Sequence, residues 1–185
     1  MPYIAISPWL AALVLWAVLL TTAHADNQPP SHIAAEIPQA RLAGQGAFRW
    51  FGLKLYDARL WTGSQGYRGD ASAFAIDLRY ARDLKGSRIA GASHDEIEKL
   101  GIGSPDQRAA WLARMEKLFP DVRDGTHITG VYLPGEGARF YLDGKALGEV
   151  KDAEFGKAFF AIWMDARTTA PALRAALLGN ATPPQ

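Results

Sequence analysis

The 185-residue sequence contains no cysteine, which excludes disulfide bonds, thiolate metal sites, iron–sulfur clusters and cysteine nucleophiles. It also has almost no net charge, because 20 Lys and Arg residues are balanced by 19 Asp and Glu residues with the signs interleaved. No basic block and no internal repeat is present, so we expect no nucleic-acid partner. Without disulfides, the chain must hold its fold together by burial alone.

The longest apolar run lies near the N-terminus, at residues 9–20, and no Lys or Arg precedes it. The run is shorter than the ~20 apolar residues that span a bilayer, and Ala23 and Ala25 supply the small residues of a signal-peptidase site. We therefore expect a signal peptide at residues 1–25, with an uncleaved anchor as the alternative. Export and the absence of cysteine fit a bacterial periplasm, with no stable membrane insertion after cleavage.

The remaining chain divides into a polar, proline-rich segment at residues 26–40, expected to be flexible, a single domain at residues 41–179, and a loose tail at residues 180–185. Alternating apolar residues predict strands at residues 41–51, 53–61, 73–82, 126–133, 138–142 and 146–150. Helical spacing predicts helices at residues 87–100, 104–119, 153–163 and 171–178, with caps at Ser87, Ser104 and Asp152. This order predicts an α+β domain with a mostly antiparallel sheet.

Four stretches of the sequence resemble the chalcone isomerase-like family, in its bacterial, exported branch. They are FRWFGLKLYDARLW at residues 48–61, LRYARDLKGSRIA at 78–90, GVYLPGEGARFYLDGKALGEVKDAEFGKAFFAIWM at 130–164 and PALRAALLG at 171–179. Their order matches the family's, and they are spread over nearly all of the mature chain. The resemblance implies an open-faced β-sandwich, in which helices cover one face of a large antiparallel sheet and the ligand cleft lies between sheet and helices.

Enzymes of this family close a flavanone ring by adding a phenolate to an enone, and their site uses an arginine, a threonine, a tyrosine, an asparagine and a late Ser or Thr. Carried over onto this sequence, the strand threonine falls on Phe51, and the arginine falls where there is none. The helix tyrosine falls on Ile89 and the asparagine near Glu96, while Thr168 and Thr169 lie near the late position. The resemblance therefore implies a member without chalcone isomerase activity, catalytic residues, cofactor or metal.

Other non-catalytic members of the family bind fatty acids, using an arginine and a tyrosine to hold the carboxylate. Arg49 and Tyr56 match those residues in type. We therefore expect an exported, non-catalytic protein that binds a small amphipathic acid, such as a fatty acid, in the cleft between sheet and helices. The expected ligand contacts are Arg49, Tyr56, Tyr80, Phe159 and Trp163.

Two alternative functions stay open. An isomerase or lyase acting on an enone-like substrate would need a general acid or base, for which Tyr56, Tyr80 and Lys54 are the candidates. An interaction module of a cell-envelope assembly would use the sheet edge or the tail. The candidate ligand residues also have structural readings, because an aromatic stripe at helical spacing is core first and a strand arginine is commonly exposed or ion-paired.

Overall fold

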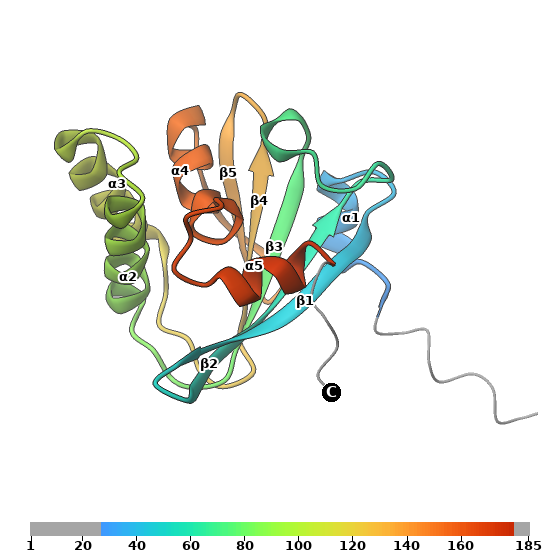
Figure 1. Ribbon diagram of the computed structural model, residues 1–185, viewed down its shortest axis with the longest axis horizontal. Coiled ribbons are helices and arrows are strands. Elements are labelled where there is room, and N and C mark those ends of the chain that lie inside the picture. Colours follow the sequence, from blue (N-terminus) through green and yellow to red (C-terminus); the bar gives the residue numbers. More distant parts are fainter. Residues whose placement is uncertain (1–26, 180–185) are drawn as a thin grey trace, which may run out of the picture.

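In the computed structural model, which describes residues 27–179, six strands form one antiparallel sheet in which each strand pairs with the next along the chain (Figure 1). The strands are β1 Arg41–Trp50, β2 Leu53–Thr62, β3 Phe74–Tyr80, β4 His127–Leu133, β5 Gly137–Leu142 and β6 Lys145–Val150. The helices are α1 Ser31–Glu36, the short 3-10 helix η3 Gly69–Ala71, α2 Gly86–Lys99, α3 Pro105–Leu118, α4 Ala153–Met164 and α5 Pro171–Leu177. The predicted α+β class and open antiparallel sheet are confirmed.

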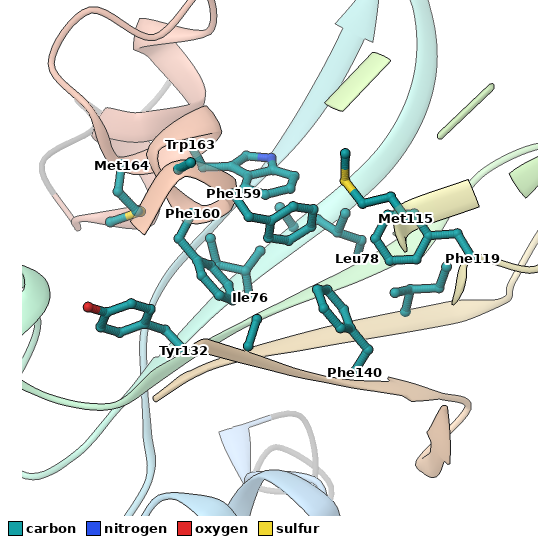
Figure 2. Packing of buried hydrophobic residues seen from close by; sticks show 14 of the residues in the cluster. Ile76, Leu78, Met115, Phe119, Tyr132, Phe140, Phe159, Phe160, Trp163 and Met164 are labelled. Atoms are coloured by element: carbon teal, nitrogen blue, oxygen red, sulfur yellow. The ribbon is translucent and has the colours of Figure 1, made fainter. Parts of the chain in front are cut away.

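One face of the sheet carries the main core, because the apolar side chains of each strand alternate toward α2, α3, α4 and α5. On β3 the core residues are Phe74, Ile76, Leu78 and Tyr80, the face predicted from the alternation. Figure 2 shows the side chains of α4 packed against this face, with Phe159 directed between the strands and α3. The aromatic stripe of α4 is thus part of the core.

The helix starts are fixed by local chemistry. Ser104 forms the predicted capping box with Gln107, and the Asp152 carboxylate accepts hydrogen bonds from the backbone N–H groups of Glu154 and Phe155. The predicted cap at Ser87 is wrong. The helix begins one residue earlier, at Gly86, whose backbone N–H donates instead to the Asp121 side chain 3.0 Å away.

The opposite face of the sheet has a smaller core under α1. Ile33 and Ile37 pack there with Trp61, Val131 and other residues of β2 to β5, and Ile33 is fully buried. The segment at residues 26–40 was expected to be flexible, but the structure has α1 within it. A six-residue helix with a single large apolar residue, Ile33, gives little periodic signal, and such a short helix is stabilised by tertiary packing rather than by its own propensity.

Candidate functional site

Four of the five predicted ligand contacts lie together at the boundary between sheet and helices. Tyr56 on β2 and Tyr80 on β3 are register partners whose rings meet edge to face at 6.0 Å. From α4, the Trp163 indole N–H donates a hydrogen bond of 3.1 Å to the Tyr56 hydroxyl, and the Phe159 ring lies 5.4 Å from Trp163. Strand alternation and the helical spacing of residues 159 and 163 bring these side chains to the same interface.

The two tyrosine hydroxyls lie in apolar surroundings, and this raises the pKa of both. Burial is the main cause at each site; the charge of Glu96 adds to it for Tyr56, and Tyr56 itself adds to it for Tyr80. Both phenols therefore stay protonated at physiological pH. The Tyr56 oxygen accepts the Trp163 bond, and among residues 27–179 no acceptor is found for the proton of either hydroxyl. The site thus offers two O–H donors in apolar surroundings.

Arg49 does not join this cluster. It is exposed at the end of β1, and its Nη1 lies 3.4 Å from the carbonyl oxygen of Gly52 in the turn that follows. Phe48 lies opposite Tyr56 in the register that runs on from Gly44 and Leu60, and the two rings stack at 5.2 Å; the register shifts only after this pair, between Phe48 and Arg49. The residue beside the tyrosine is therefore apolar, and the predicted pairing of Arg49 with Tyr56 as a joint anchor is not formed.

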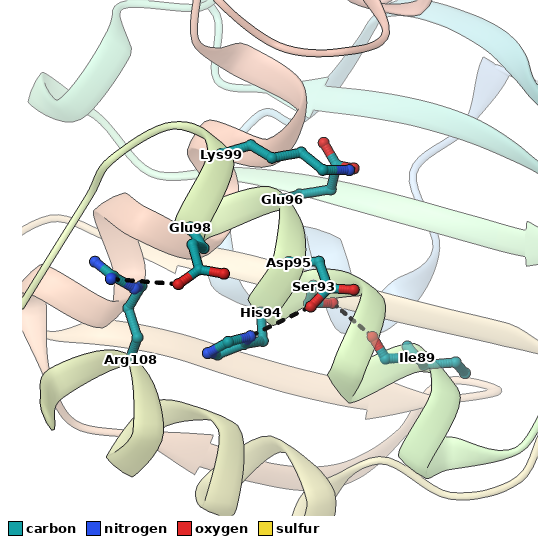
Figure 3. Close-up of polar contacts among 8 residues, drawn as sticks. All are labelled: Ile89, Ser93, His94, Asp95, Glu96, Glu98, Lys99 and Arg108. Atoms are coloured by element: carbon teal, nitrogen blue, oxygen red, sulfur yellow. Dashed lines mark hydrogen bonds and ion pairs between the residues drawn. The ribbon is translucent and has the colours of Figure 1, made fainter. Parts of the chain in front are cut away.

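Glu96 on α2 is the charged group that acts on the tyrosine cluster: its charge raises the pKa of Tyr56. Its carboxylate accepts a hydrogen bond of 2.7 Å from Lys99 and one of 2.6 Å from the Thr169 hydroxyl. Figure 3 shows Glu96 and Lys99 on the same helix as His94 and Glu98. Glu96 is therefore held in place and its charge is largely balanced by the Lys99 ammonium.

A hollow of about 280 Å³ lies on another side of α4. Phe74, Phe160 and Met164 give it apolar walls, and its charged wall residues are Asp70, Lys157 and Asp165. Lys157 is ion-paired with Glu154 at 3.1 Å. This hollow is a second place at the sheet–helix boundary where an amphipathic molecule could contact the rings of Phe74 and Phe160 together with the Lys157 ammonium.

The face of the sheet opposite α2 to α5 holds a larger hollow, of about 540 Å³, which the sequence reasoning missed. Its charged wall residues are Asp57, Arg59, Asp77, Arg79 and His127. All project from the polar side of β2, β3 and β4, so the signal available from the sequence was the polar alternation of these strands. That alternation does not show which strands lie side by side, so the hollow could not be predicted from it.

Within that hollow, His127 and Asp77 form a hydrogen-bonded pair. His127 Nδ1 lies 3.0 Å from the buried Asp77 carboxylate, which also accepts from the Thr129 hydroxyl at 2.8 Å. His32 of α1 completes the chain, with Nε2 2.9 Å from the Thr129 oxygen. The Asp77 hydrogen bond is the main cause of a raised pKa for His127, whereas burial lowers the pKa of His32. In the part of the chain that the structure describes, no three His, Asp or Glu side chains are arranged to hold a metal ion.

Comparison with known proteins decides the family. The family model described as chalcone isomerase-like matches residues 23–179. The chain belongs to the chalcone isomerase-like family.

Two individual proteins are also similar to the chain, one in sequence and one in fold. An uncharacterised protein of Haemophilus influenzae is 27% identical over 137 residues, which cover 74% of this chain and 67% of that protein. The crystal structure of a fatty-acid binding protein of Arabidopsis thaliana superposes with a TM-score of 0.59 at 13% identity, covering 77% of this chain and 88% of the plant protein. The structural likeness shows a common fold, and within residues 27–179 no helix is long and apolar enough to cross a membrane.

The structure also locates the residues that stand where we expect catalytic residues in the chalcone isomerases of this family. Phe51, at the expected threonine position, is 87% exposed at the hairpin tip, far from any enclosed site. Glu96 and Thr169, near the expected asparagine and late threonine positions, are in direct contact beside Tyr56. The structure therefore places Glu96 and Thr169 side by side and Phe51 at the surface.

Proposed function

We propose that this chalcone isomerase-like protein is an exported, non-catalytic binding protein for a small amphipathic acid of the fatty-acid type. Its fold is shared with a plant protein described as fatty-acid binding, and its family match covers the whole described domain. The ligand's apolar part would lie against the half-buried ring pair Phe48 and Tyr56, at the side of the cluster open to solvent. Export is part of the proposal, and fractionation of cells expressing the full chain tests it.

The observation that carries this proposal is the pair of phenol donors. A carboxyl group accepts hydrogen bonds, and Tyr56 and Tyr80 supply two O–H donors that have no acceptor among the described residues. A ligand carboxyl that accepts from both hydroxyls would gain two hydrogen bonds in apolar surroundings. Among residues 27–179, the groups that act on the pKa of the two phenols include no arginine or lysine, so the acid would be held by hydrogen bonds, as a protonated carboxyl.

The same geometry disfavours the enone isomerase alternative at this site. Burial raises the pKa of Tyr56 and Tyr80, so neither phenol would act as a base near neutral pH. Lys54 is ion-paired with Asp57 at 2.6 Å, on the exposed part of the hairpin. His127 and Asp77 form a histidine–carboxylate pair at 3.0 Å that could transfer a proton, and a chalcone turnover assay of the wild type and His127→Gln would reveal such an activity.

The test of the binding proposal is a fatty-acid titration combined with mass spectrometry of lipids extracted from the purified protein. We expect saturable binding, and we expect Tyr56→Phe to weaken it roughly five- to tenfold, the effect of one lost hydrogen bond. Tyr67→Phe is the matched control. Tyr67 packs against Phe74 in the second hollow, so its loss should leave the affinity unchanged.

Two results would contradict the proposal. The first is an extract without lipid together with a titration that does not saturate. The second is a protein whose affinity falls with Tyr67→Phe but not with Tyr56→Phe, which would move the ligand to the hollow beside Lys157. Thermal unfolding of each variant separates a loss of ligand contact from a loss of fold.

A further inference from the structure

The exposed large hydrophobic side chains of residues 27–179 are all at one place. Trp50, Phe51 and Leu53 are 60%, 87% and 52% exposed, and they occupy the tip of the β1–β2 hairpin. The Trp50 and Phe51 rings touch edge to face, with centroids 4.9 Å apart. A contiguous apolar tip of this kind marks a contact with another molecule more often than scattered apolar residues do.

The backbone of the tip shows that Phe51 is there at a conformational cost. Trp50 and Leu53 pair across a two-residue turn, in which Phe51 has a φ of 46° and Gly52 a φ of 78°. Turns with two positive φ angles favour Asn or Asp followed by Gly, because a bulky side chain is strained there. Phe51 is 87% exposed and its printed ring contact is with the neighbouring Trp50, so burial within the described domain does little to offset the strain. The fold itself does not account for a phenylalanine at this position.

The tip also stands clear of the rest of the sheet. The last register pair between β2 and β3 is Tyr56 with Tyr80, so the hairpin residues beyond Tyr56 have no strand beside them except each other. Figure 1 shows the hairpin extending past the ends of the neighbouring strands. The apolar surface is therefore convex and offers no groove to a partner.

Two cations lie directly behind the apolar tip, one on each strand. Arg49 precedes Trp50, and its exposed guanidinium approaches only the Gly52 carbonyl among the contacts of the turn. Lys54 follows Leu53 and is paired with Asp57. An apolar end bordered by Arg and Lys matches a bilayer interface, where Trp and Phe reach the acyl boundary and cations meet lipid phosphates.

We propose that the β1–β2 hairpin tip is a peripheral membrane contact that binds anionic lipid surfaces. Trp50, Phe51 and Leu53 enter the headgroup–acyl boundary, and Arg49 meets the phosphates. A protein partner fits less well, because stable interfaces bury about 800 Å² on each side and three side chains on a convex turn cannot supply this. The proposal is independent of the ligand proposed for the tyrosine cluster.

The experiment is co-sedimentation with vesicles of phosphatidylcholine, alone or mixed with phosphatidylglycerol. The protein used in this experiment starts at Asp26, because the apolar run at residues 9–20 would bind lipid by itself. Every described element and both cores lie within residues 27–179, so they are all kept. The decisive variant is Phe51→Asn. Asn tolerates positive φ better than Phe, so the variant should unfold at the same or a higher temperature while its vesicle partitioning falls by about tenfold or more.

The charge contribution is tested by Arg49→Gln, with Lys145→Gln as the matched control. Lys145 is exposed beside the β5–β6 turn, so its loss removes the same charge from another hairpin. We expect Arg49→Gln alone to weaken binding to the anionic vesicles and to reduce its salt dependence.

Equal vesicle binding by the wild type and Phe51→Asn would overturn the proposal. So would binding that ignores phosphatidylglycerol and responds equally to both charge variants. A self-association that Phe51→Asn abolishes, seen by size-exclusion chromatography without any vesicle binding, would assign the tip to a protein contact instead.

Discussion

At the scale of single residues, the Asp77–His127 pair makes the stability of the protein depend on pH. The hydrogen bond to Asp77 and the charges of Asp77 and Asp143 raise the pKa of His127, while burial and Arg79 act against them. The folded pKa thus lies above the reference value of 6.5. Protonated His127 therefore stabilises the fold fully below pH 6.5, and this contribution is lost as the pH rises through the folded pKa.

We expect His127→Gln to lower the unfolding temperature most between about pH 5.5 and pH 6.5 and least near pH 8. The effect should remain below about 1 kcal/mol, because the His127 side chain is partly exposed and solvent screens the pair. The pKa of His32 is lowered mainly by burial and in part by the charge of His127, so it has the opposite dependence, and losing that charge in the variant offsets part of the effect at low pH. Thermal scans across this pH range check the prediction, and a difference that grows toward pH 8 would reverse its sign.

These residues also show the limit of reading a site from the sequence. The partnership of His127 with Asp77 could not be predicted from the sequence, because Asp77 is 50 positions away and lies beside His127 only through the pairing of β3 with β4. Tyr56, Tyr80, Phe159 and Trp163 were predictable because each followed a clear period toward the core. Arg49 was misplaced because Phe48, the residue before it, is the partner of Tyr56, and strand alternation directs Arg49 to the other face.

At the scale of elements, α5 depends on a glycine of β1 for its place on the sheet. A Cβ atom at Gly44 would lie 2.2 Å from the Ala176 carbonyl oxygen and 2.4 Å from that of Leu177. Both are backbone atoms of the last turn of α5 and cannot move aside without shifting the helix. This contact explains why a strand of apolar and aromatic residues carries glycine at this position.

We expect Gly44→Ala to destabilise the domain by about 2 kcal/mol or more, because the helix must move off the strand. Gly91→Ala is the matched control. Gly91 lies inside α2, and a Cβ there would meet nothing within 4 Å, so alanine should stabilise the protein by about 0.5–1 kcal/mol. Urea unfolding of both variants gives the comparison, and equal effects of the two substitutions would show that α5 can move without cost.

The elements themselves were predictable where local chemistry defines them. The capping box at Ser104, the Asp152 cap and the alternation of β3 fixed three elements, because each signal depends on neighbours in the sequence. Helix α1 was not predictable in this way. Its stability comes from Trp61, Val131 and other residues far along the chain.

At the scale of the whole molecule, the sheet has unequal cover on its two faces. Four helices bury one face, while α1 covers only part of the other and leaves the polar hollow beside it (Figure 1). Two kinds of contact hold α1 against the sheet. Ile33 fills the smaller core, and Glu36 accepts hydrogen bonds from Arg139 and Tyr141 on β5.

Because Ile33 is fully buried, Ile33→Ala should destabilise the protein by about 2–4 kcal/mol, the usual effect of a large-to-small change in a core. Ala34→Ser, one position along the same helix but exposed, should change stability by less than about 0.5 kcal/mol. Equilibrium unfolding in urea measures both. Hydrogen exchange then shows whether α1 detaches alone or with the sheet. Loss of protection at α1 without any change in global unfolding would make it a loosely docked segment rather than the third layer of the fold.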